Sequence, residues 1–173
     1  EFVKGIDNPI GIKIGPDYVI EEILQILNKI NPLNESGKVM LISRMGIDQI
    51  NFKLKPLIEA IKESNNNNVI WICDPMHGNT FSYNTYKVRK FENITAEIKA
   101  FFAICDTSGV VPGGVHLELT EENVTECTGG VSNINLSDLN VNYTTKVDPR
   151  LNALQGLEIA FIISELISKY QNK

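Results

Sequence analysis

The chain has 173 residues, of which 43% are hydrophobic and 21% are charged, a composition typical of one globular domain rather than a disordered segment. Its net charge of −5 argues against a general nucleic-acid or anionic-membrane binder, because both classes need excess positive charge. No apolar run approaches the roughly 20 residues of a membrane span, and residues 1–7 lack the basic start and apolar stretch of a signal peptide.

Apolar periodicity predicts strands and helices in strict alternation along the chain. Apolar, β-branched runs indicate strands, and apolar residues at helical spacing indicate helices, in the order strand 10–14, helix 19–30, strand 38–43, helix 54–63, strand 69–73, helix 91–106, strand 114–119 and helix 151–170. Four consecutive βα units imply an α/β fold with parallel strands and right-handed crossovers. The fourth strand is delayed by an insertion after Pro75, and no linker-like stretch divides the chain, so residues 1–173 are treated as one unit.

Polar side chains that suit catalysis follow the ends of the predicted strands. Lys13 is near the end of the first strand, Arg44 follows the second, Asp74 and His77 follow the third, and Glu118 is near the end of the fourth. In parallel α/β folds, ligands bind at the carboxyl ends of the strands. We therefore expect these side chains to meet at one site.

The residue types at this edge indicate a divalent metal. His77 lies in a Gly- and Pro-rich turn that suits a ligand, and Asp148 lies in the loop before the last helix, where it could join Glu118. A His–Glu–Asp set suits Mn, Fe, Co or Zn used as a Lewis acid. For each residue the alternative is a solvated or capping polar group. His116 fits a supporting or packing role better than a ligand role.

Basic residues mark the same edge. Lys13 and Arg44 could hold the phosphate and the carboxylate of one small molecule, with simple surface charge as the alternative. Only three of the 16 basic residues are Arg, so an Arg here can mark a need for a planar, bidentate donor. Arg89, in the basic loop KVRK, is ambiguous, and Arg150 is expected to hold Asp148 or a nearby helix end.

The cysteines do not suggest a disulfide framework. Cys73, Cys105 and Cys127 are an odd number without CxxC spacing, which favours a reducing compartment. Cys73 and Cys127 lie close to the predicted site in sequence, so either is a weaker alternative as a further metal ligand.

Several longer motifs occur together in a specific order. They are NPIGIKIGP (8–16), SRMG (43–46), CDPMHGNT (73–80), PGGVHLELT (112–120), NVTECTGG (123–130) and DPRLN (148–152). From about residue 1 to about residue 168 the chain resembles the class II 3-deoxy-D-arabino-heptulosonate 7-phosphate (DAHP) synthases. The resemblance implies the C-terminal half, strands five to eight, of a (β/α)8 (TIM) barrel. It also implies the first step of the shikimate pathway of aromatic amino acid biosynthesis, the condensation of phosphoenolpyruvate with erythrose 4-phosphate.

Residue roles follow from the same resemblance. The implied ligands of a divalent metal, Mn²⁺ first with Co²⁺, Zn²⁺ or Fe²⁺ as alternatives, are His77, Glu118 and Asp148. Lys13 and Arg44 resemble phosphoenolpyruvate-binding residues, and Asp74 resembles an acidic residue beside the metal and the aldehyde substrate. The implied catalytic set is Lys13, Arg44, Asp74 and His77.

The chain departs from the family pattern by one missing metal ligand and by three replaced residues. The family's fourth metal ligand, a cysteine in an N-terminal motif, has no counterpart, and Cys105, Glu121 and Val147 replace a usual His, Gly and Cys. We therefore expect the C-terminal half of a synthase, weakly active or inactive alone. One alternative is a non-catalytic half-barrel that binds a metal or a phosphorylated ligand, or pairs with a partner chain. Another is a metal-dependent lyase or hydrolase.

The expected ligands are thus phosphoenolpyruvate and erythrose 4-phosphate, with no nucleic-acid or membrane partner and with a homo-oligomer of the full-length protein. The expected location is the cytoplasm, or a plastid if the full-length protein carries a transit peptide. Because an isolated half-barrel exposes the edges of its first and fourth strands, these edges should be covered or paired.

Overall fold

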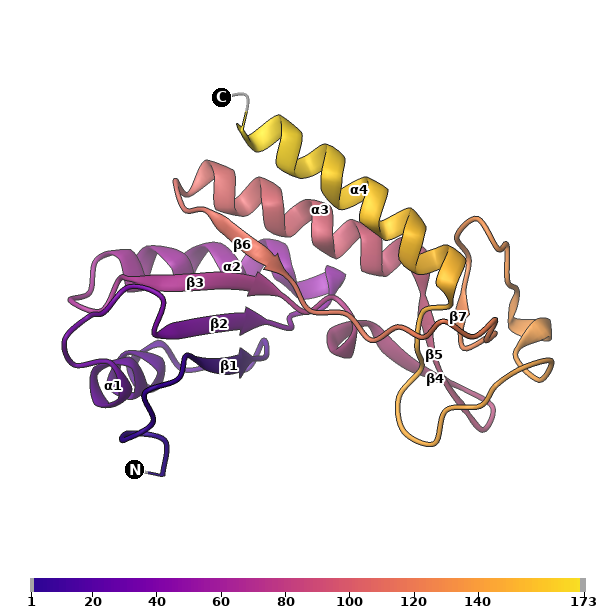
Figure 1. Ribbon diagram of the computed structural model, residues 1–173, viewed down its shortest axis with the longest axis horizontal. Coiled ribbons are helices and arrows are strands. Elements are labelled where there is room, and N and C mark those ends of the chain that lie inside the picture. The colour runs from indigo at the N-terminus through magenta and orange to yellow at the C-terminus, as the bar shows by residue number, and fades with distance from the viewer. Residues whose placement is uncertain (1, 172–173) are drawn as a thin grey trace.

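The computed structural model describes residues 2–171, and its helices and strands alternate largely as the sequence predicts (Figure 1). The helices and strands in chain order are β1 (Ile10–Ile14), α1 (Ile20–Ile30), β2 (Val39–Ser43), α2 (Ile47–Lys62), β3 (Val69–Cys73), β4 (Thr80–Tyr83), β5 (Tyr86–Lys90), α3 (Phe91–Thr107), β6 (Pro112–Val115), β7 (Cys127–Thr128) and α4 (Ala153–Gln171). Short 3-10 helices occupy His77–Asn79 and Leu136–Asp138. Within the described range, no helix combines the length and the apolar character needed to cross a membrane.

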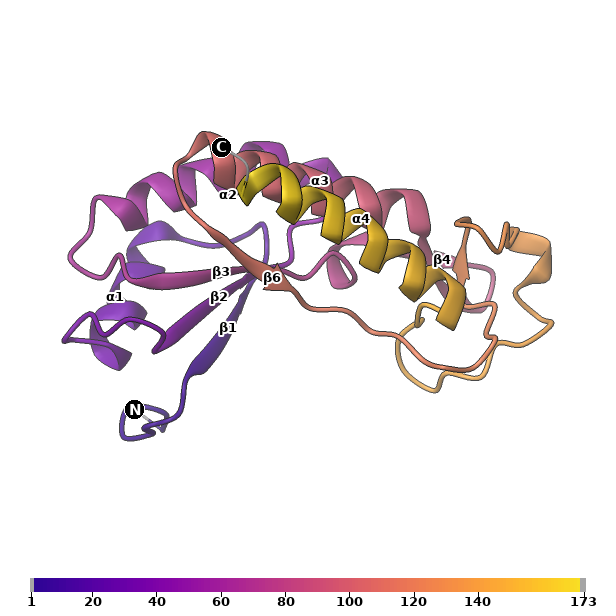
Figure 2. The ribbon, with the colours of Figure 1, turned by 45° about the horizontal axis from the view of Figure 1, so that its top comes forward.

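Four parallel strands form the main sheet in the order β1-β2-β3-β6. Each strand is added beside the one before it in the chain, without the reversal of strand order that marks a doubly wound sheet. Buried residues of α1, α2 and α3 join the buried strand residues in one hydrophobic core, and Figure 2 shows α2, α3 and α4 running along one side of the strands. This arrangement is consistent with part of a barrel.

The two faces of the sheet differ in what covers them. Leu41 of β2 is fully buried under the helices, whereas Met40 and Ile42 lie on the opposite face and are partly exposed. Ile42 pairs laterally with Lys13 of β1 and with Ile72 of β3, so this opposite face is largely apolar and ends in a lysine. Such a face is typical of a barrel interior, which is filled by branched side chains.

Helix α2 begins earlier than predicted, at Ile47 rather than at residue 54. Ile50 and Leu54 are fully buried and extend the apolar face toward the N-terminus, so the shorter prediction was wrong. Pro56 lies inside the helix on its exposed side. A proline removes one backbone hydrogen bond from a helix, and here tertiary packing of the buried face outweighs that loss.

Strand β6 is shorter than predicted and ends at Val115 rather than at residue 119. Its partner β3 ends at Cys73, so after the hydrogen bond from His116 N to the Cys73 carbonyl there is no neighbouring strand to pair with. Glu118 therefore lies in a loop and not on a strand.

The insertion after Pro75 forms a second sheet that the sequence analysis did not predict. β4 and β5 form an antiparallel hairpin, and β7 pairs parallel to β5. Figure 1 shows this sheet and the loops around it beyond the C-terminal ends of the parallel strands. The hairpin is therefore placed to contribute to the edge where the polar residues were expected to meet.

Two glycines let the loops after β2 and β3 contact each other through their backbones. A Cβ on Gly46 would lie 2.6 Å from the Gly78 carbonyl oxygen, and a Cβ on Gly78 would lie 2.7 Å from Gly46 Cα. Gly46 also has φ +81°, which favours glycine. The loop that carries Arg44 is thereby fixed against the loop that carries His77.

We expect Gly78→Ala to lower the free energy of unfolding by about 1–3 kcal/mol, because the new methyl group would overlap backbone atoms that cannot rotate away. Urea unfolding followed by circular dichroism measures this change. Gly156→Ala is the matched control, since its Cβ would meet only Leu119 at 3.9 Å. Equal stability of Gly78→Ala and the unsubstituted chain would contradict the close contact.

Candidate metal and anion site

The structure brings the three predicted metal ligands together from three separate loops. His77 Nε2 lies 3.6 Å from Glu118 Oε1 and 3.9 Å from Asp148 Oδ2. One ligand atom from each of the three residues lies within 4.8 Å of the other two, and all three side chains are partly buried. The grouping arises because β3, β6 and the loop before α4 all deliver their residues to the same edge.

Asp74 orients the side chains of His77 and Lys13 through hydrogen bonds. Its fully buried carboxylate accepts hydrogen bonds from His77 Nδ1 at 2.7 Å, from Lys13 Nζ at 2.6 Å and from the backbone N–H groups of Met76 and His77. Burial alone would raise the pKa of Asp74, but the hydrogen bonds from Lys13 and His77 outweigh it, and the pKa lies below its ordinary value. An ionised Asp74 places the His77 proton on Nδ1 and leaves the Nε2 lone pair facing Glu118 and Asp148.

This geometry fits a divalent cation. Metal-binding histidines usually donate their other ring N–H to a carboxylate, as His77 does to Asp74. An imidazole lone pair and two carboxylates that converge without hydrogen atoms between them repel one another unless a proton or a cation lies among them. The donor set of one nitrogen and several oxygens suits Mn, Fe, Co or Zn.

Neither the cysteines nor the second histidine belongs to this group. Among the described residues only His77, Glu118 and Asp148 form a cluster that could hold a metal ion, and His116 is exposed. All three cysteines are free and buried, as expected for a chain without disulfides. Burial raises the pKa of Cys127 to about 12. The alternative in which Cys73 or Cys127 is a ligand gains no support, because neither belongs to the cluster.

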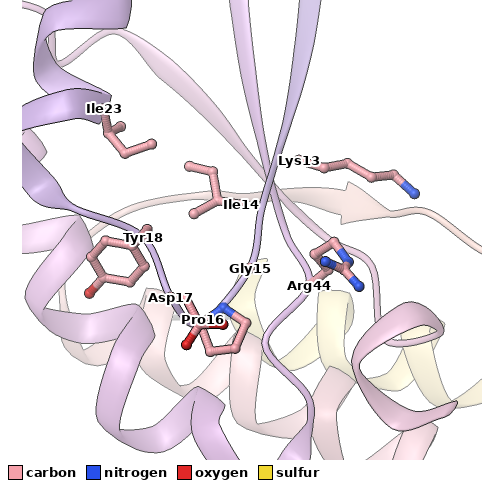
Figure 3. A pocket seen from close by; sticks show the side chains of 8 residues that line it. All are labelled: Lys13, Ile14, Gly15, Pro16, Asp17, Tyr18, Ile23 and Arg44. Atoms are coloured by element: carbon pink, nitrogen blue, oxygen red, sulfur yellow. The ribbon is translucent and has the colours of Figure 1, made fainter.

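Lys13 and Arg44 line a pocket of about 350 Å³ next to the metal cluster (Figure 3). Their cationic ends lie on the same side of β1, away from Tyr18 and Ile23, which line the opposite part of the pocket. Lys13 is already paired with Asp74, whereas the interactions of the described residues include no acidic partner for the partly buried Arg44. A partly buried guanidinium next to a pocket is suited to bind an anion in a bidentate manner.

Strand β5 supplies two further cations to the acidic ligands. Lys87 Nζ donates to Asp148 Oδ1 at 2.8 Å, and Arg89 Nη1 donates to Glu118 Oε2 at 2.5 Å. The two residues are two positions apart and so lie on the same side of the strand. The hydrogen bond from Lys87 is the main reason that the pKa of Asp148 lies below its ordinary value.

A buried glutamate, Glu97 of α3, connects the two loops that Gly46 and Gly78 hold in contact. Its carboxylate accepts from the N–H groups of Met45 and Gly46 at 3.2 and 2.9 Å and from Asn79 Nδ2 at 2.6 Å. Burial raises the pKa of Glu97 to about 7, against the lowering effect of these hydrogen bonds. Glu97 thus fixes the backbone directly after Arg44 relative to the turn that contains His77.

A second buried glutamate, Glu126, holds the loop that contains Asp148. It accepts hydrogen bonds from the side chain and the N–H of Arg150 and from the N–H groups of Thr144 and Thr145. Burial alone would raise the pKa of Glu126, but these donors lower it overall. The expectation that Arg150 holds Asp148 or a helix end was wrong, because its guanidinium pairs with the buried Glu126 at 2.8 Å.

Comparison with known proteins identifies the family. The sequence model of the class-II DAHP synthetase family matches residues 1–164. This chain belongs to the class-II DAHP synthetase family. It is 44% identical over 167 residues to the phospho-2-dehydro-3-deoxyheptonate aldolase AroG of Mycolicibacterium smegmatis, and 45% identical over the same length to a phospho-2-dehydro-3-deoxyheptonate aldolase of Streptomyces coelicolor. The resemblance drawn from the sequence motifs is confirmed.

The chain spans only about a third of the length of the relatives it matches. Both alignments cover 96% of this chain, but only 36% of the Mycolicibacterium protein and 37% of the Streptomyces protein.

Three buried charged residues that shape the site, Glu97, Arg89 and Glu126, were not predicted from the sequence. Glu97 offers a usable signal, because it lies on the apolar face of its helix together with Ile94 and Ile98. Arg89 was noticed as one of only three arginines, but it received no role. Glu126 has no such signal, since its importance comes from a loop that folds back from about 20 residues further along the chain.

The raised pKa of Glu97 predicts that the stability of the chain depends on pH. A carboxyl whose folded pKa lies above its unfolded value of 4.5 contributes stability below about pH 4.5 that is lost as the pH rises through about 7. Between pH 5 and 8 the free energy of unfolding of the unsubstituted chain should therefore fall, by up to about 3 kcal/mol, as Glu97 loses its proton. In Glu97→Gln this part of the fall should be absent, because glutamine does not titrate. Urea unfolding at each pH measures this difference.

We assign the change in stability between pH 5 and 8 to Glu97. The pKa values of Asp74, Glu126 and Asp148 are lowered, so these groups change the stability at more acidic pH. Glu59→Gln, which removes a half-exposed carboxylate on α2, is the control and should leave the slope between pH 5 and 8 unchanged. Parallel pH curves for Glu97→Gln and the unsubstituted chain would show that the Glu97 carboxyl does not titrate in this range.

Proposed function

We propose that this chain provides the metal-binding and phosphoenolpyruvate-binding half of a DAHP synthase, which joins phosphoenolpyruvate to erythrose 4-phosphate and releases inorganic phosphate. The observation that carries the proposal is the cluster of His77, Glu118 and Asp148 beside the cations Lys13 and Arg44 at one edge of the sheet. Family membership and the names of the two relatives support the same activity.

In this proposal β1, β2, β3 and β6 are strands five to eight of a (β/α)8 barrel, and residues 1–173 form one unit of it. Two observations support this placement. The outer edges of β1 and β6 have no partner strand in the sheet formed by the described residues. The large apolar side chains of Leu154, Leu157 and Phe161 in α4 are all at least half exposed. Both features suit a sheet and a helix layer that continue into further βα units.

The metal would be held by His77 Nε2, Glu118 and Asp148, with Mn²⁺ as the first choice and Co²⁺, Zn²⁺ or Fe²⁺ as alternatives. A divalent ion bound there supplies Lewis-acid polarisation of an aldehyde oxygen. The residues around it limit the local charge: Lys13, Lys87 and Arg89 each pair with an acidic residue, namely Asp74, Asp148 and Glu118. The added charge of the ion then makes the site attractive to phosphorylated, carboxylated substrates.

Lys13 and Arg44 would bind phosphoenolpyruvate through its phosphate and carboxylate and hold its C3 toward the aldehyde. Donors that are fixed before the reaction stabilise the charge that develops on the substrate oxygens. A water would then add to C2, and phosphate would leave. We assign Asp74 to orienting Lys13 and His77, because its carboxylate is fully buried and already accepts four hydrogen bonds.

A second candidate is a half-barrel that binds a metal or a phosphorylated ligand without catalysis. It rests on the same residues, because the cluster of His77, Glu118 and Asp148 and the pocket with Lys13 and Arg44 can bind a metal and an anion without a reaction. Phosphate release separates the two. It is measured with Mn²⁺ and both substrates, for the chain alone and for the chain mixed with a separately supplied N-terminal part of the Mycolicibacterium relative. Activity only on mixing supports the synthase proposal, whereas Mn²⁺ binding with no activity in either sample supports the second candidate.

The two histidines of the chain give a matched pair for the metal site. His77→Ala should weaken Mn²⁺ binding by at least about 100-fold and abolish phosphate release, because it removes a ligand. His116→Ala should change neither, because His116 is exposed and lies outside the cluster. Isothermal titration with Mn²⁺ measures both affinities. Unchanged Mn²⁺ affinity in His77→Ala would rule out the site.

Arg44 tests the anion half of the proposal separately. Arg44→Ala should weaken phosphoenolpyruvate binding by about 10- to 100-fold, since a hydrogen bond to a charged group contributes about 1.5–3 kcal/mol. Mn²⁺ affinity should be nearly unchanged, because Arg44 is not a member of the ligand cluster. Lys55→Ala, at an exposed position on α2, is the control. Equal phosphoenolpyruvate affinity in both variants would exclude Arg44 from substrate binding.

A further inference from the structure

Arg89 is the largest of the fully buried side chains in the described part of the chain. It lies on β5, and its guanidinium donates from Nε to Thr80 Oγ1 at 2.8 Å, and from Nη1 to both Glu118 Oε2 and the Pro149 carbonyl oxygen, each at 2.5 Å. A buried charge is unfavourable unless it is paired and hydrogen-bonded. Packing alone therefore does not explain why a charged side chain is buried at this position.

One nitrogen of Arg89 connects two segments that carry different members of the metal cluster. Nη1 contacts Glu118 directly and contacts the carbonyl of Pro149, the residue immediately after Asp148. The two oxygens of Glu118 are thereby divided: Oε2 faces Arg89, and Oε1 faces His77 Nε2 at 3.6 Å. This division leaves one oxygen of Glu118 for a cation.

Stability alone explains this residue poorly. Arg89 Nη2 is buried and has no hydrogen-bond partner, and an unpaired buried donor is unfavourable. The full positive charge beside Glu118 also competes with a cation for the same carboxylate. A smaller neutral donor would avoid both disadvantages. It would lack the forked guanidinium, whose nitrogens reach Thr80 on one side and Glu118 and the Pro149 carbonyl on the other.

We propose that Arg89 is a positioning residue of the metal centre, which holds Glu118 as a ligand through one oxygen and keeps the Asp148 segment at ligand distance. This inference rests on the proposed metal site of His77, Glu118 and Asp148. Thr80 completes the arrangement, because its hydroxyl accepts from Nε and fixes the plane of the guanidinium. The hairpin of β4 and β5 thus serves the metal centre from outside the parallel sheet.

The test is Mn²⁺ binding by the 173-residue chain. Isothermal titration measures the affinity, and the electron paramagnetic resonance spectrum reports on the surroundings of the bound ion. Arg89→Lys keeps the charge but loses the fork, and it should weaken Mn²⁺ binding by about 10- to 100-fold, the range seen when a residue that orients a ligand is removed. The spectrum of the remaining bound Mn²⁺ should change. Lys90→Gln, an exposed position on the same strand, is the control and should match the unsubstituted chain.

A second variant covers the case in which Arg89→Lys fails to fold. Thr80→Val keeps Arg89 and its charge, removes the acceptor for Nε together with the longer hydrogen bond from Thr80 Oγ1 to the Met76 carbonyl, and should weaken Mn²⁺ binding by a few-fold. In a Glu118→Gln background, Arg89→Lys should have little further effect on Mn²⁺ affinity, because the residue through which it acts is already altered. A purely structural role predicts instead that the metal-free melting temperature falls while the Mn²⁺ spectrum is unchanged.

The outcomes separate this inference from the proposed function. If the unsubstituted chain binds Mn²⁺ and both Arg89→Lys and Thr80→Val bind it with the same affinity and spectrum, the positioning role of Arg89 is overturned and the metal site stands. If the unsubstituted chain binds no Mn²⁺, or binds it equally well after His77→Ala, the metal site itself is overturned and the role of Arg89 with it.

Discussion

The candidate site depends on one buried carboxylate at the end of β3. Asp74 receives His77 and Lys13 on one oxygen and the backbone of the following turn on the other, so it fixes a metal ligand and an anion-binding cation at once. Because Asp74 is fully buried, its charge must be compensated locally, and Lys13 and His77 provide that compensation. The orientation of His77 Nε2 toward Glu118 and Asp148 is a consequence of this pairing.

Around Asp74, three buried charged residues hold the loops that carry the site. Glu97 fixes the loops after β2 and β3, Glu126 fixes the loop before α4, and Arg89 bridges the segments of Glu118 and Asp148. None of the loops belongs to the regular part of the sheet, where backbone hydrogen bonds would fix them. Buried side-chain hydrogen bonds take over this function, which explains why charged groups are tolerated in the interior of the chain.

Much of the fold could be predicted from local sequence. The five-residue apolar runs of β1, β2 and β3 and the helical spacing in α1 and α3 lie where expected, since periodic burial is written directly into the pattern. The hairpin of β4 and β5 was missed because its strands are only four and five residues long and mostly polar. The early start of α2 was missed because Pro56 and a polar stretch obscure the buried face.

The sequence by itself determined the family, the parallel βα order and the types of residue at the site, because motifs and apolar periodicity are local properties of the chain. Only the tertiary structure decided which charges pair. Lys13 with Asp74, Arg89 with Glu118 and Arg150 with Glu126 are separated by 61, 29 and 24 residues. Pairings of this kind are set by how the loops fold over the sheet edge, since a charge taken out of water is stable only beside a partner that the fold brings to it.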